Sequence, residues 1–439
     1  MSLLAGTAIA DISPGAGLEL GGYPHFPRNN TGVHDPLHAS CIFLDDGKSK
    51  IAIIALDILF YSKKHVASIR ERIERETGIP HLNIMVSCSH THSGPWASGR
   101  LDIDSLMSGV KQDEEYVNSL NGKIVSIVKE AVANAFVAKI GYSKGHCGRE
   151  QGIGGNRREI GGPCDPLVSV LSVADRYGSV KAALVNYTLH PTVIHEDSAV
   201  VTADYPGYIR KYLKSALPGM NLLFTQGASG NQSSRYFRQG QSYDEAERIG
   251  YAIGREAASV LGGIEYKENA ALFAVSEEVA IELRSLPTKD EMLQKVSEAK
   301  EEYERLRRVN AQYLEVQNAN LKLLGAEDLL GYIQMFEQGQ KIELYEDEKE
   351  AEVQVLGIGD ARIVGLPGEV FVEFGLEIKK QSPYPFTVIS EIANGCLPGY
   401  VCTREAYAAG GYETDTSLLS ADFGYKLAQT AIRLLKQEK

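Results

Sequence analysis

Histidines that follow apolar runs are the residues whose type and spacing first suggest chemistry. His90 and His92 lie in SHTHSGP, residues 89–95, directly after the apolar run at 82–89. Alternate residues of an extended strand share a face, so both imidazoles are expected on one side of the strand end. They could bind Zn²⁺ together, or one could bind while the other moves protons. Because two further ligands are lacking, hydrogen-bonded loop histidines are an equal alternative.

A second predicted strand, within AALVNYTLHPT at 182–192, also ends in a histidine, His190. A histidine before a proline at a strand end is commonly part of a turn. Together with His90, however, it is a candidate third imidazole. His195 follows five residues later, and spacing alone does not exclude it as the ligand.

A glycine-rich loop at 224–234 follows another predicted strand and carries three hydroxyls, those of Ser229, Ser233 and Ser234. The loop nearly forms the G-x-S-x-G motif of serine hydrolases. Asn231 occupies the fifth position, so a nucleophile elbow is only weakly indicated.

Charged residues elsewhere are candidates for supporting roles. Arg157 and Arg158 place positive charge in the glycine-rich stretch 152–162, where they could bind a substrate carbonyl or carboxylate. Glu369 is expected at a helix start, where a carboxylate either complements the helix dipole or reaches a metal. Asp57 ends a predicted strand and could orient one of the histidines or close a turn.

The elements that must position these residues alternate between β-branched runs and amphipathic helical patterns. Such alternation predicts an α/β fold with layered sheets, and no internal repeat is detected. Strands are expected at 51–60, 82–89, 167–174, 180–188, 221–225, 352–358, 361–366 and 386–392. Helices are expected at 65–77, 114–135, 205–215, 244–261, 369–380 and 421–436.

The stretch from about 287 to 340 has a helical pattern instead. Thr288 and Glu291 form a capping box, and apolar residues then recur in steps of three and four along a charged helix. We expect this helix to end near Gly325 and a shorter one to cover 326–336. The insertion is interpreted as packed on the core or on a helical partner, which makes it a possible homo-oligomer contact.

Composition excludes several classes of protein. The 439 residues carry a net charge of -12 without a long run of Lys or Arg, so no nucleic-acid partner is expected. No apolar stretch approaches the ~20 residues that span a bilayer, so no membrane insertion is expected. Six cysteines without a C-x-x-C pair, and an N-terminus without signal-peptide features, predict a cytoplasmic protein. No linker divides the chain, so residues 1–439 are predicted to form one domain.

Taken together, the motifs resemble the neutral/alkaline non-lysosomal ceramidase family. In family order the matches are ADISPG (10–15), TGVHDPLHA (31–39), ALD (55–57), SHTHSGP (89–95), NRR (156–158), LHPT (189–192), a Gly-Asn-x-Ser loop (230–233), LPGE (366–369) and ANGCLPGYVCTREAYAAGGYE (393–413). They cover most of the chain outside the helical insertion. The resemblance implies a catalytic domain that hydrolyses an N-acyl amide bond with one Zn²⁺.

Carried over residue by residue, the resemblance also implies roles for single side chains. Zinc would be held by four residues, His90, His190, Glu369 and Tyr400. His92 would match an active-site histidine, Arg157 an active-site arginine, and Ser233 a proposed nucleophile. With zinc lowering the pKa of a bound water toward ~7, His92 could take or return a proton while Arg157 stabilises the oxyanion.

The leading hypothesis is therefore a zinc-dependent hydrolase of a soluble or amphiphilic N-acyl compound. A zinc hydrolase of the same fold that cleaves an ester or a glycoside is one alternative, because fold and metal do not fix the scissile bond. The alternative of another class is a non-catalytic protein that binds a partner through the helical hairpin at 288–338.

Overall fold

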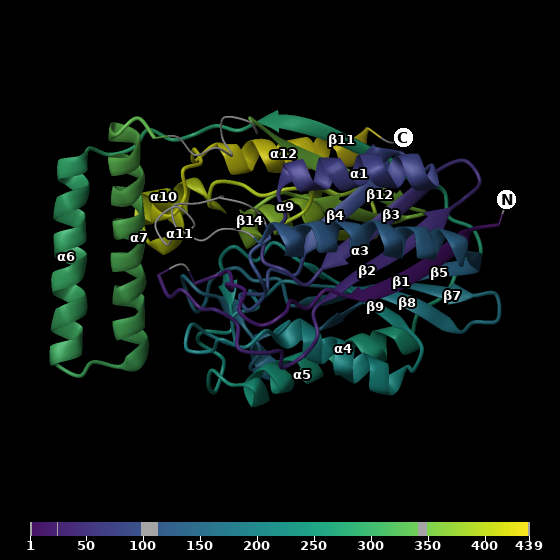
Figure 1. The fold of residues 1–439 in the computed structure, drawn as a ribbon, viewed down its shortest axis with the longest axis horizontal. Coiled ribbons are helices and arrows are strands. Elements are labelled where there is room, and N and C mark those ends of the chain that lie inside the picture. Colours follow the sequence, from purple (N-terminus) through teal and green to yellow (C-terminus); the bar gives the residue numbers. More distant parts are fainter. Residues whose placement is uncertain (1, 24, 98–112, 341–348, 438–439) are drawn as a thin grey trace.

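The computed structural model describes residues 2–23, 25–97, 113–340 and 349–437. Its largest element is a mixed sheet of eight strands in the order β4-β3-β2-β1-β5-β7-β8-β9 (Figure 1). The strands are β1 (Leu4–Asp11), β2 (His38–Asp45), β3 (Lys50–Leu56), β4 (Ile84–Cys88), β5 (Phe136–His146), β7 (Leu167–Asp175), β8 (Val180–Tyr187) and β9 (Asn221–Gln226). Each edge is a parallel pair, and the strands between them are antiparallel.

The two halves of this sheet repeat one order of elements: three antiparallel strands, a helix, a parallel edge strand and a second helix. In the first half the helices are α1 (Lys63–Thr77) and α3 (Glu114–Ala133), and in the second half they are α4 (Tyr205–Ala216) and α5 (Tyr243–Gly262). The helices of each half pack on their own strands through separate apolar clusters. The amino-acid sequence alone did not reveal this duplication.

A second sheet of four strands shares an apolar core with the first. It contains β11 (Leu272–Ala280), β12 (Glu350–Ile358), β13 (Ala361–Gly365) and β15 (Phe386–Ser390). Its other face is covered by α9 (Val372–Gln381) and α12 (Phe423–Lys436). In the shared core Ile53 and Leu184 of the large sheet meet Leu356 and Val388 of the small one. The α/β fold with layered mixed sheets that the sequence predicted is confirmed.

Some strands escaped prediction because small residues weaken the strand pattern. β1, with the sequence LAGTAIAD, and β5, which contains Gly141 and Gly145, are examples. At Gly141 the missing side chain admits the segment after α5, since a Cβ there would lie 2.6 Å from the carbonyl oxygen of Glu265. Glycine is therefore required within this strand.

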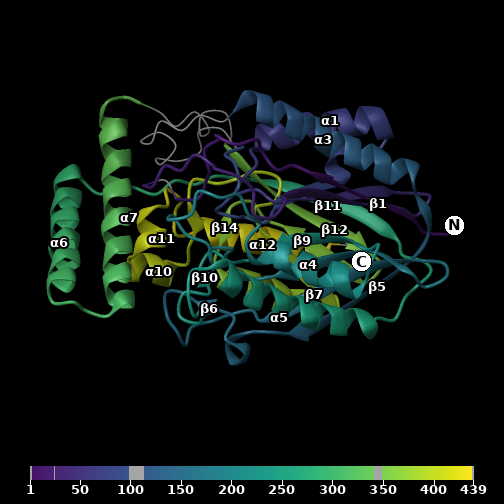
Figure 2. The ribbon, with the colours of Figure 1, turned by 60° about the horizontal axis from the view of Figure 1, so that its bottom comes forward.

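The helical insertion is a hairpin of α6 (Lys289–Arg308) and α7 (Tyr313–Glu337). It lies at one end of the molecule beside α10 (Arg404–Ala409) and α11 (Tyr412–Asp415), and both termini lie toward the other end (Figures 1 and 2). Thr288 and Glu291 form the expected capping box. The turn, however, falls at 309–312, where Asn310 has a φ of 49°.

The predicted helix end at Gly325 is wrong, because this glycine lies inside α7. Its missing side chain permits close packing on α11: a Cβ would lie 3.1 Å from the Cβ of Asp415 and 3.2 Å from the Cα of Tyr412. The glycine thus marks a helix contact and not a helix end.

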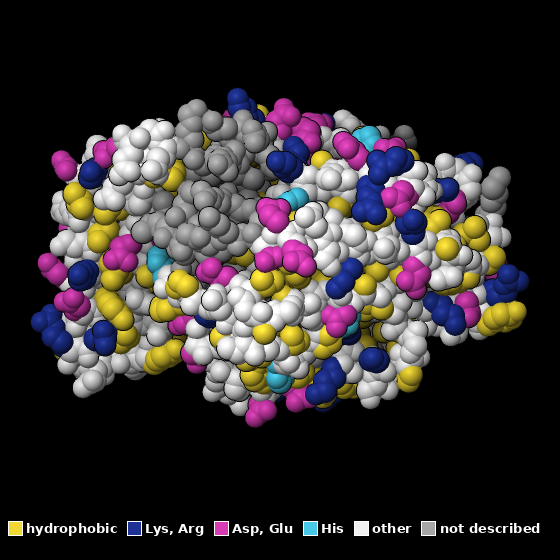
Figure 3. Space-filling view, viewed as in Figure 1, with side chains coloured by type: hydrophobic (Ala, Val, Ile, Leu, Met, Phe, Trp, Pro, Cys, Tyr) yellow, Lys and Arg dark blue, Asp and Glu magenta, His cyan; other side chains and the backbone are white. Residues whose placement is uncertain are grey.

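The surface carries intermixed charges, as Figure 3 shows for the described part of one face. Within the described ranges, no helix combines the length and apolar character that a membrane crossing needs. None of the six cysteines, all of which lie in the described ranges, forms a disulfide bond.

Gly325→Leu should push α7 away from α11, because the new side chain meets Tyr412 and Asp415. We expect the free energy of unfolding to fall by about 1–3 kcal/mol, as for overpacking in a core. Gly122→Leu in α3 is the matched control: nothing lies within 4 Å of a Cβ there, and removing a helix-interior glycine stabilises by up to about 1 kcal/mol. Denaturant unfolding of both variants measures the difference, and equal effects would argue against the packing contact.

Candidate active site

The apolar run before His90 forms β4, which ends at Cys88. The chain then turns: the His90 amide donates to the carbonyl of Ile58 at 3.0 Å, and His90 has a φ of 66°. The sequence predicted that His90 and His92 share one face of an extended strand. The structure instead brings their rings together through this left-handed residue, with the two ring planes at 88°.

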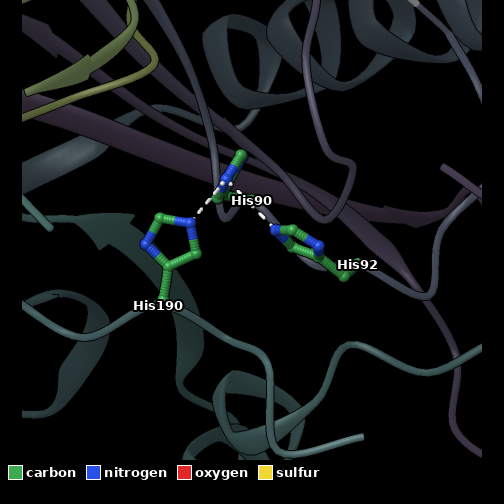
Figure 4. A group of neighbouring side chains, drawn as sticks. All are labelled: His90, His92 and His190. Carbon is green, nitrogen blue, oxygen red and sulfur yellow. Dashed lines mark hydrogen bonds between the residues drawn. The ribbon is translucent and has the colours of Figure 1, made fainter. Parts of the chain in front are cut away.

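His190 joins this pair from the segment that follows β8. Its amide donates to the carbonyl of Gln232, in the short strand β10 (Gln232–Ser233), which pairs with β6 (Gly155–Asn156). In Figure 4 the ring of His90 lies between the other two, with its Nε2 3.1 Å from Nε2 of His190 and 3.3 Å from Nε2 of His92. His90 and His190 are buried, and His92 is half-buried.

A backbone carbonyl holds the other ring nitrogen of each histidine. The Nδ1 atoms lie 3.1, 2.7 and 2.9 Å from carbonyl oxygens, in the pairs His90–Leu59, His92–Gly22 and His190–Ser229. A carbonyl oxygen can only accept, so each Nδ1 must donate its hydrogen. Each Nε2 of a neutral imidazole then carries a lone pair and no hydrogen. Three acceptors that face one another without a donor form a site for a cation.

Glu369 adds a fourth acceptor. It was predicted at a helix start, but it lies in the two-residue strand β14 (Glu369–Val370), which pairs in parallel with β16 (Tyr400–Val401). Its Oε1 is 3.2 Å from Nε2 of His90 and 3.1 Å from Nε2 of His190. Ligand atoms in a tetrahedral zinc site are about 3.3 Å apart. The three atoms therefore have the spacing of one face of such a site.

Burial is the main influence on the protonation of these groups. It lowers the pKa of His190 to about 4, with a contribution from the positive charge of Arg157, and it lowers the pKa of His92 well below its usual value. Both imidazoles are therefore neutral near pH 7. Burial, with the charge of Glu369, raises the pKa of Tyr400 well above its usual value, so the phenol keeps its proton.

Arg157 is held beside Tyr400 by Glu413, a residue that the sequence did not single out. Nε of Arg157 donates to Oε1 of Glu413 at 2.8 Å, and Nη1 of Arg158 donates to Oε2 at 2.7 Å. The guanidinium carbon of Arg157 lies 5.2 Å from the centre of the Tyr400 ring. Its Nη2 is buried and has no hydrogen-bond partner among the described residues, so an acceptor is missing there.

A pocket of about 120 Å³ opens beside these groups. His92, Arg157, Ser233 and Tyr400 line it, so His92 is the imidazole of the cluster that faces the pocket. Another wall comes from α7, which contributes residues between Tyr313 and Leu324. The helical insertion is thus part of the site, which the sequence did not indicate.

The glycine-rich loop before and within β10 contributes two of its serines to the site. Oγ of Ser233 accepts a hydrogen bond from the amide of Arg235 at 3.0 Å. Oγ of Ser229 lies 3.3 Å from Nδ1 of His190 and donates to the buried carboxyl group of Glu391. Glu391 also accepts from the amide of Val370 at 2.8 Å, so it ties the loop to β14. Sequence reasoning missed Glu391.

Asp57 does not orient any of the three histidines, so that part of the sequence hypothesis is wrong. Its Oδ2 accepts from the amide of His38 at 2.9 Å and lies 2.8 Å from Nη2 of Arg210. The backbone carbonyls take the orienting role instead.

His195, the alternative that spacing left open beside His190, lines the pocket and lies outside the cluster. Its Nδ1 lies 2.8 Å from Oε2 of Glu196, and its Nε2 lies 2.8 Å from Nη1 of Arg238. Both ring nitrogens are thus engaged elsewhere.

We expect the purified protein to hold about one equivalent of a divalent transition metal. His90→Ala, His190→Ala and Glu369→Ala should each weaken metal binding at least about tenfold, because each removes an acceptor that faces the others. Mass spectrometry and competition with a chelator measure this. His81→Ala is the control, since His81 is exposed and pairs with Glu74. Retention of the metal in all three variants would exclude this site.

Glu413→Gln should leave Arg157 and Arg158 without their buried counter-ion. We expect the free energy of unfolding to fall by about 3 kcal/mol, because a buried guanidinium loses its charged partner. Asp422→Asn, which breaks the exposed pair with Arg404, should cost less than about 1 kcal/mol. Denaturant unfolding measures the free energy of unfolding of both variants. Equal decreases in the two variants would mean that the ion pairs of Glu413 contribute little to stability.

The sequence of this chain is similar to those of known ceramidases. The family described as neutral/alkaline non-lysosomal ceramidase, N-terminal, matches residues 3–223. The neutral ceramidase of Pseudomonas aeruginosa is 24% identical over 245 residues, and neutral ceramidase B of Dictyostelium discoideum is 24% identical over 217 residues. These matches cover 52% and 46% of this chain but 36% and 30% of the relatives. The matched part thus spans about a third of the relatives' length.

Solved structures show the same fold over the whole chain. The crystal structure of the Pseudomonas aeruginosa neutral ceramidase matches with a TM-score of 0.75 and 19% identity, covering 100% of this chain and 75% of that one. A ceramidase complexed with C2 matches with a TM-score of 0.75 and 18% identity, covering 100% and 76%. With the family match over half of its residues, the chain belongs to the neutral/alkaline non-lysosomal ceramidase family.

Proposed function

We propose that this protein is a zinc-dependent hydrolase of an N-acyl amide bond. The proposal rests above all on the cluster of three imidazole nitrogens and one carboxylate oxygen, which offers only acceptors beside a pocket. Zinc suits this mixture of nitrogen and oxygen ligands. The relatives are named ceramidases, which supports an amide as the bond that is cleaved. The proposal for this chain covers the type of bond that is cleaved and does not include ceramide as its substrate.

Of the four acceptors, those of His90, His190 and Glu369 would hold the zinc, with Tyr400 as a weaker ligand. Nε2 of His92, the imidazole that faces the pocket, would stay outside the ligand set. When bound, zinc would polarise the substrate carbonyl and lower the pKa of water toward about 7. Nε2 of His92 would take the proton of the attacking water and return it to the leaving amine. The hydrogen bond from its Nδ1 to Gly22 keeps His92 in the tautomer that can accept this proton.

Arg157 would stabilise the negative charge that develops on the carbonyl oxygen. Glu413 fixes its guanidinium, so little reorganisation is needed during the reaction. Ser233 lies in the same pocket, and its hydroxyl hydrogen could bind the substrate while Oγ accepts from the Arg235 amide. Attack by Ser233 itself is the alternative, and it would need a base within hydrogen-bond reach of Oγ.

We also propose that residues 1–439 act as one domain. The pocket is lined by residues from Gly22 to Tyr412, including those of α7, and Glu413 holds Arg157 in place from the same end of the chain. Self-association through the hairpin stays a prediction. So does the non-catalytic alternative, under which deletion of the hairpin would abolish association with a partner and leave metal content unchanged.

His92→Gln should lower kcat about 10²- to 10⁴-fold, because a general acid and base is lost. Zinc content should be unchanged if His92 is no ligand. Ser233→Ala should retain most of kcat if water is the nucleophile, and His81→Gln is the control. The assay uses matched amide, ester and aryl-glycoside substrates. Faster turnover of the ester or glycoside would move the proposal to that bond, and a Ser233→Ala variant without activity would favour the serine nucleophile.

A further inference from the structure

The pocket beside the cluster carries more positive than negative charge. Three arginines line it, Arg157, Arg235 and Arg238, whereas Glu196 is the only carboxylate among the described lining residues. Arg157 is already paired with Glu413. The chain as a whole has a net charge of -12, so the excess in the pocket is a local feature.

Arg235 and Arg238 have neutral hydrogen-bond partners. Nη1 of Arg235 lies 3.4 Å from Oδ1 of Asn318, in α7. Nη1 of Arg238 donates to the carbonyl of Thr192 and to Nε2 of His195, both at 2.8 Å. Neither guanidinium forms an ion pair with a carboxylate of the described residues. Both positive charges therefore lack a direct counter-ion.

Glu196 is not a direct counter-ion of Arg238, because the ring of His195 lies between the two side chains. Nδ1 of His195 donates to Glu196, and Nε2 of His195 accepts from Arg238. The imidazole that bridges them is thus neutral. The carboxylate is one ring away from the guanidinium and lies outside hydrogen-bond reach.

The unpaired charges are costly where they lie. Burial lowers the pKa of both guanidinium groups, and the positive charge of Arg157 adds to the effect at Arg235. Such a shift means that the charged form is destabilised relative to water. A bound anion would recover part of this free energy.

Arg235 also lies next to one of the candidate reacting groups, and Arg238 lines the same pocket. Arg235 follows Ser233 by two residues, and its amide donates to Ser233 Oγ. A guanidinium presents a planar fork of donors that matches a carboxylate. The pocket of about 120 Å³ is smaller than the roughly 300 Å³ of common ligand sites, so it favours a short substrate over long alkyl chains.

We propose that Arg235 and Arg238 form a carboxylate subsite, and that the preferred substrate is a small amide with a carboxylate a few atoms from the scissile bond. This inference rests on the proposed amide hydrolysis. With the carboxylate on the amine side, the substrate is an N-acyl amino acid. With the carboxylate on the acyl side, it is a monoamide of a dicarboxylic acid.

Two matched pairs of substrates distinguish a carboxylate on the amine side from one on the acyl side. N-acetylleucine is compared with N-isopentylacetamide, and N-butylsuccinamic acid with N-butylpropanamide, so that each pair differs only in the carboxylate. In at least one pair we expect kcat/KM to be about 10- to 100-fold higher for the carboxylate member, as for a hydrogen bond to a charged group. The pair with the larger ratio identifies the side that carries the carboxylate.

Variants then assign the preference to the arginines. Arg235→Gln should bring the ratio within the preferred pair close to one, and Arg235→Lys should restore part of it because the charge returns. Arg308→Gln, an exposed arginine of α6, should leave the ratio unchanged. Thermal unfolding and metal content check that each variant folds. Equal turnover of both members of each pair, or an Arg235→Gln ratio that matches the wild type, would overturn the subsite.

A binding measurement keeps this test independent of the proposed reaction. If no amide is hydrolysed, the amide proposal fails, and calorimetry with the same pairs then decides the subsite. Tighter binding of the carboxylate member that Arg235→Gln weakens about tenfold or more supports the subsite. Equal binding of both members, or carboxylate binding that is insensitive to Arg235→Gln, contradicts it, because a carboxylate bound at the metal would not depend on this arginine.

Discussion

The site depends on acceptor atoms that are held together against their own repulsion. Neighbouring acceptors among the Nε2 atoms of His90, His92 and His190 and the Oε1 atom of Glu369 lie 3.1–3.3 Å apart. Lone pairs at this distance repel, so the side chains would separate unless the surrounding structure fixed them. It does so through three carbonyls that bind the Nδ1 hydrogens and through the pairing of β14 with β16. The fold therefore supplies free energy that a bound cation would recover.

Two glycines near the cluster follow from the same constraint. Gly22 has a φ of 97°, and a Cβ there would lie 2.5 Å from the ring of His92. The carbonyl oxygen of Gly22 accepts the hydrogen bond from Nδ1 of that ring. At Gly230 a Cβ would lie 2.6 Å from the carbonyl oxygen of Glu369, and the Gly230 amide donates to the carbonyl oxygen of Val370 at 2.9 Å. Both glycines let the backbone closely approach residues of the cluster. Glycine-rich sequence here thus reflects packing around the cluster.

The histidines that the structure brings together could be singled out from the sequence because histidine is an uncommon residue at the ends of apolar runs. Their supports could not, because they depend on contacts between distant segments. Arg157 and Glu413 are 256 positions apart, and nothing local distinguishes Glu413 from other acids at a helix start. Orienting carbonyls leave no trace in a sequence, since every residue has one, and Asp57 was chosen in their place. The hairpin turn was misplaced for a local reason: Asn310 adopts a left-handed conformation that glycine adopts more often.

The reacting groups and the pocket wall belong to different parts of the chain. The histidines and Glu369 lie in segments that follow strands of the two sheets, whereas α7 belongs to the hairpin between β11 and β12. These two strands pair directly, so the hairpin can vary without disturbing their ladder. Its anchors are side-chain contacts, such as Lys295 with Asp415 at 2.6 Å and His25 with Asp328 at 3.1 Å. A change on the pocket face of α7 would thus alter which molecules fit and leave the cluster intact. Family membership, which reflects the shared fold and motifs, therefore supports the proposed type of reaction, while under that proposal the choice of substrate would depend on α7 and on the loop after Ser233.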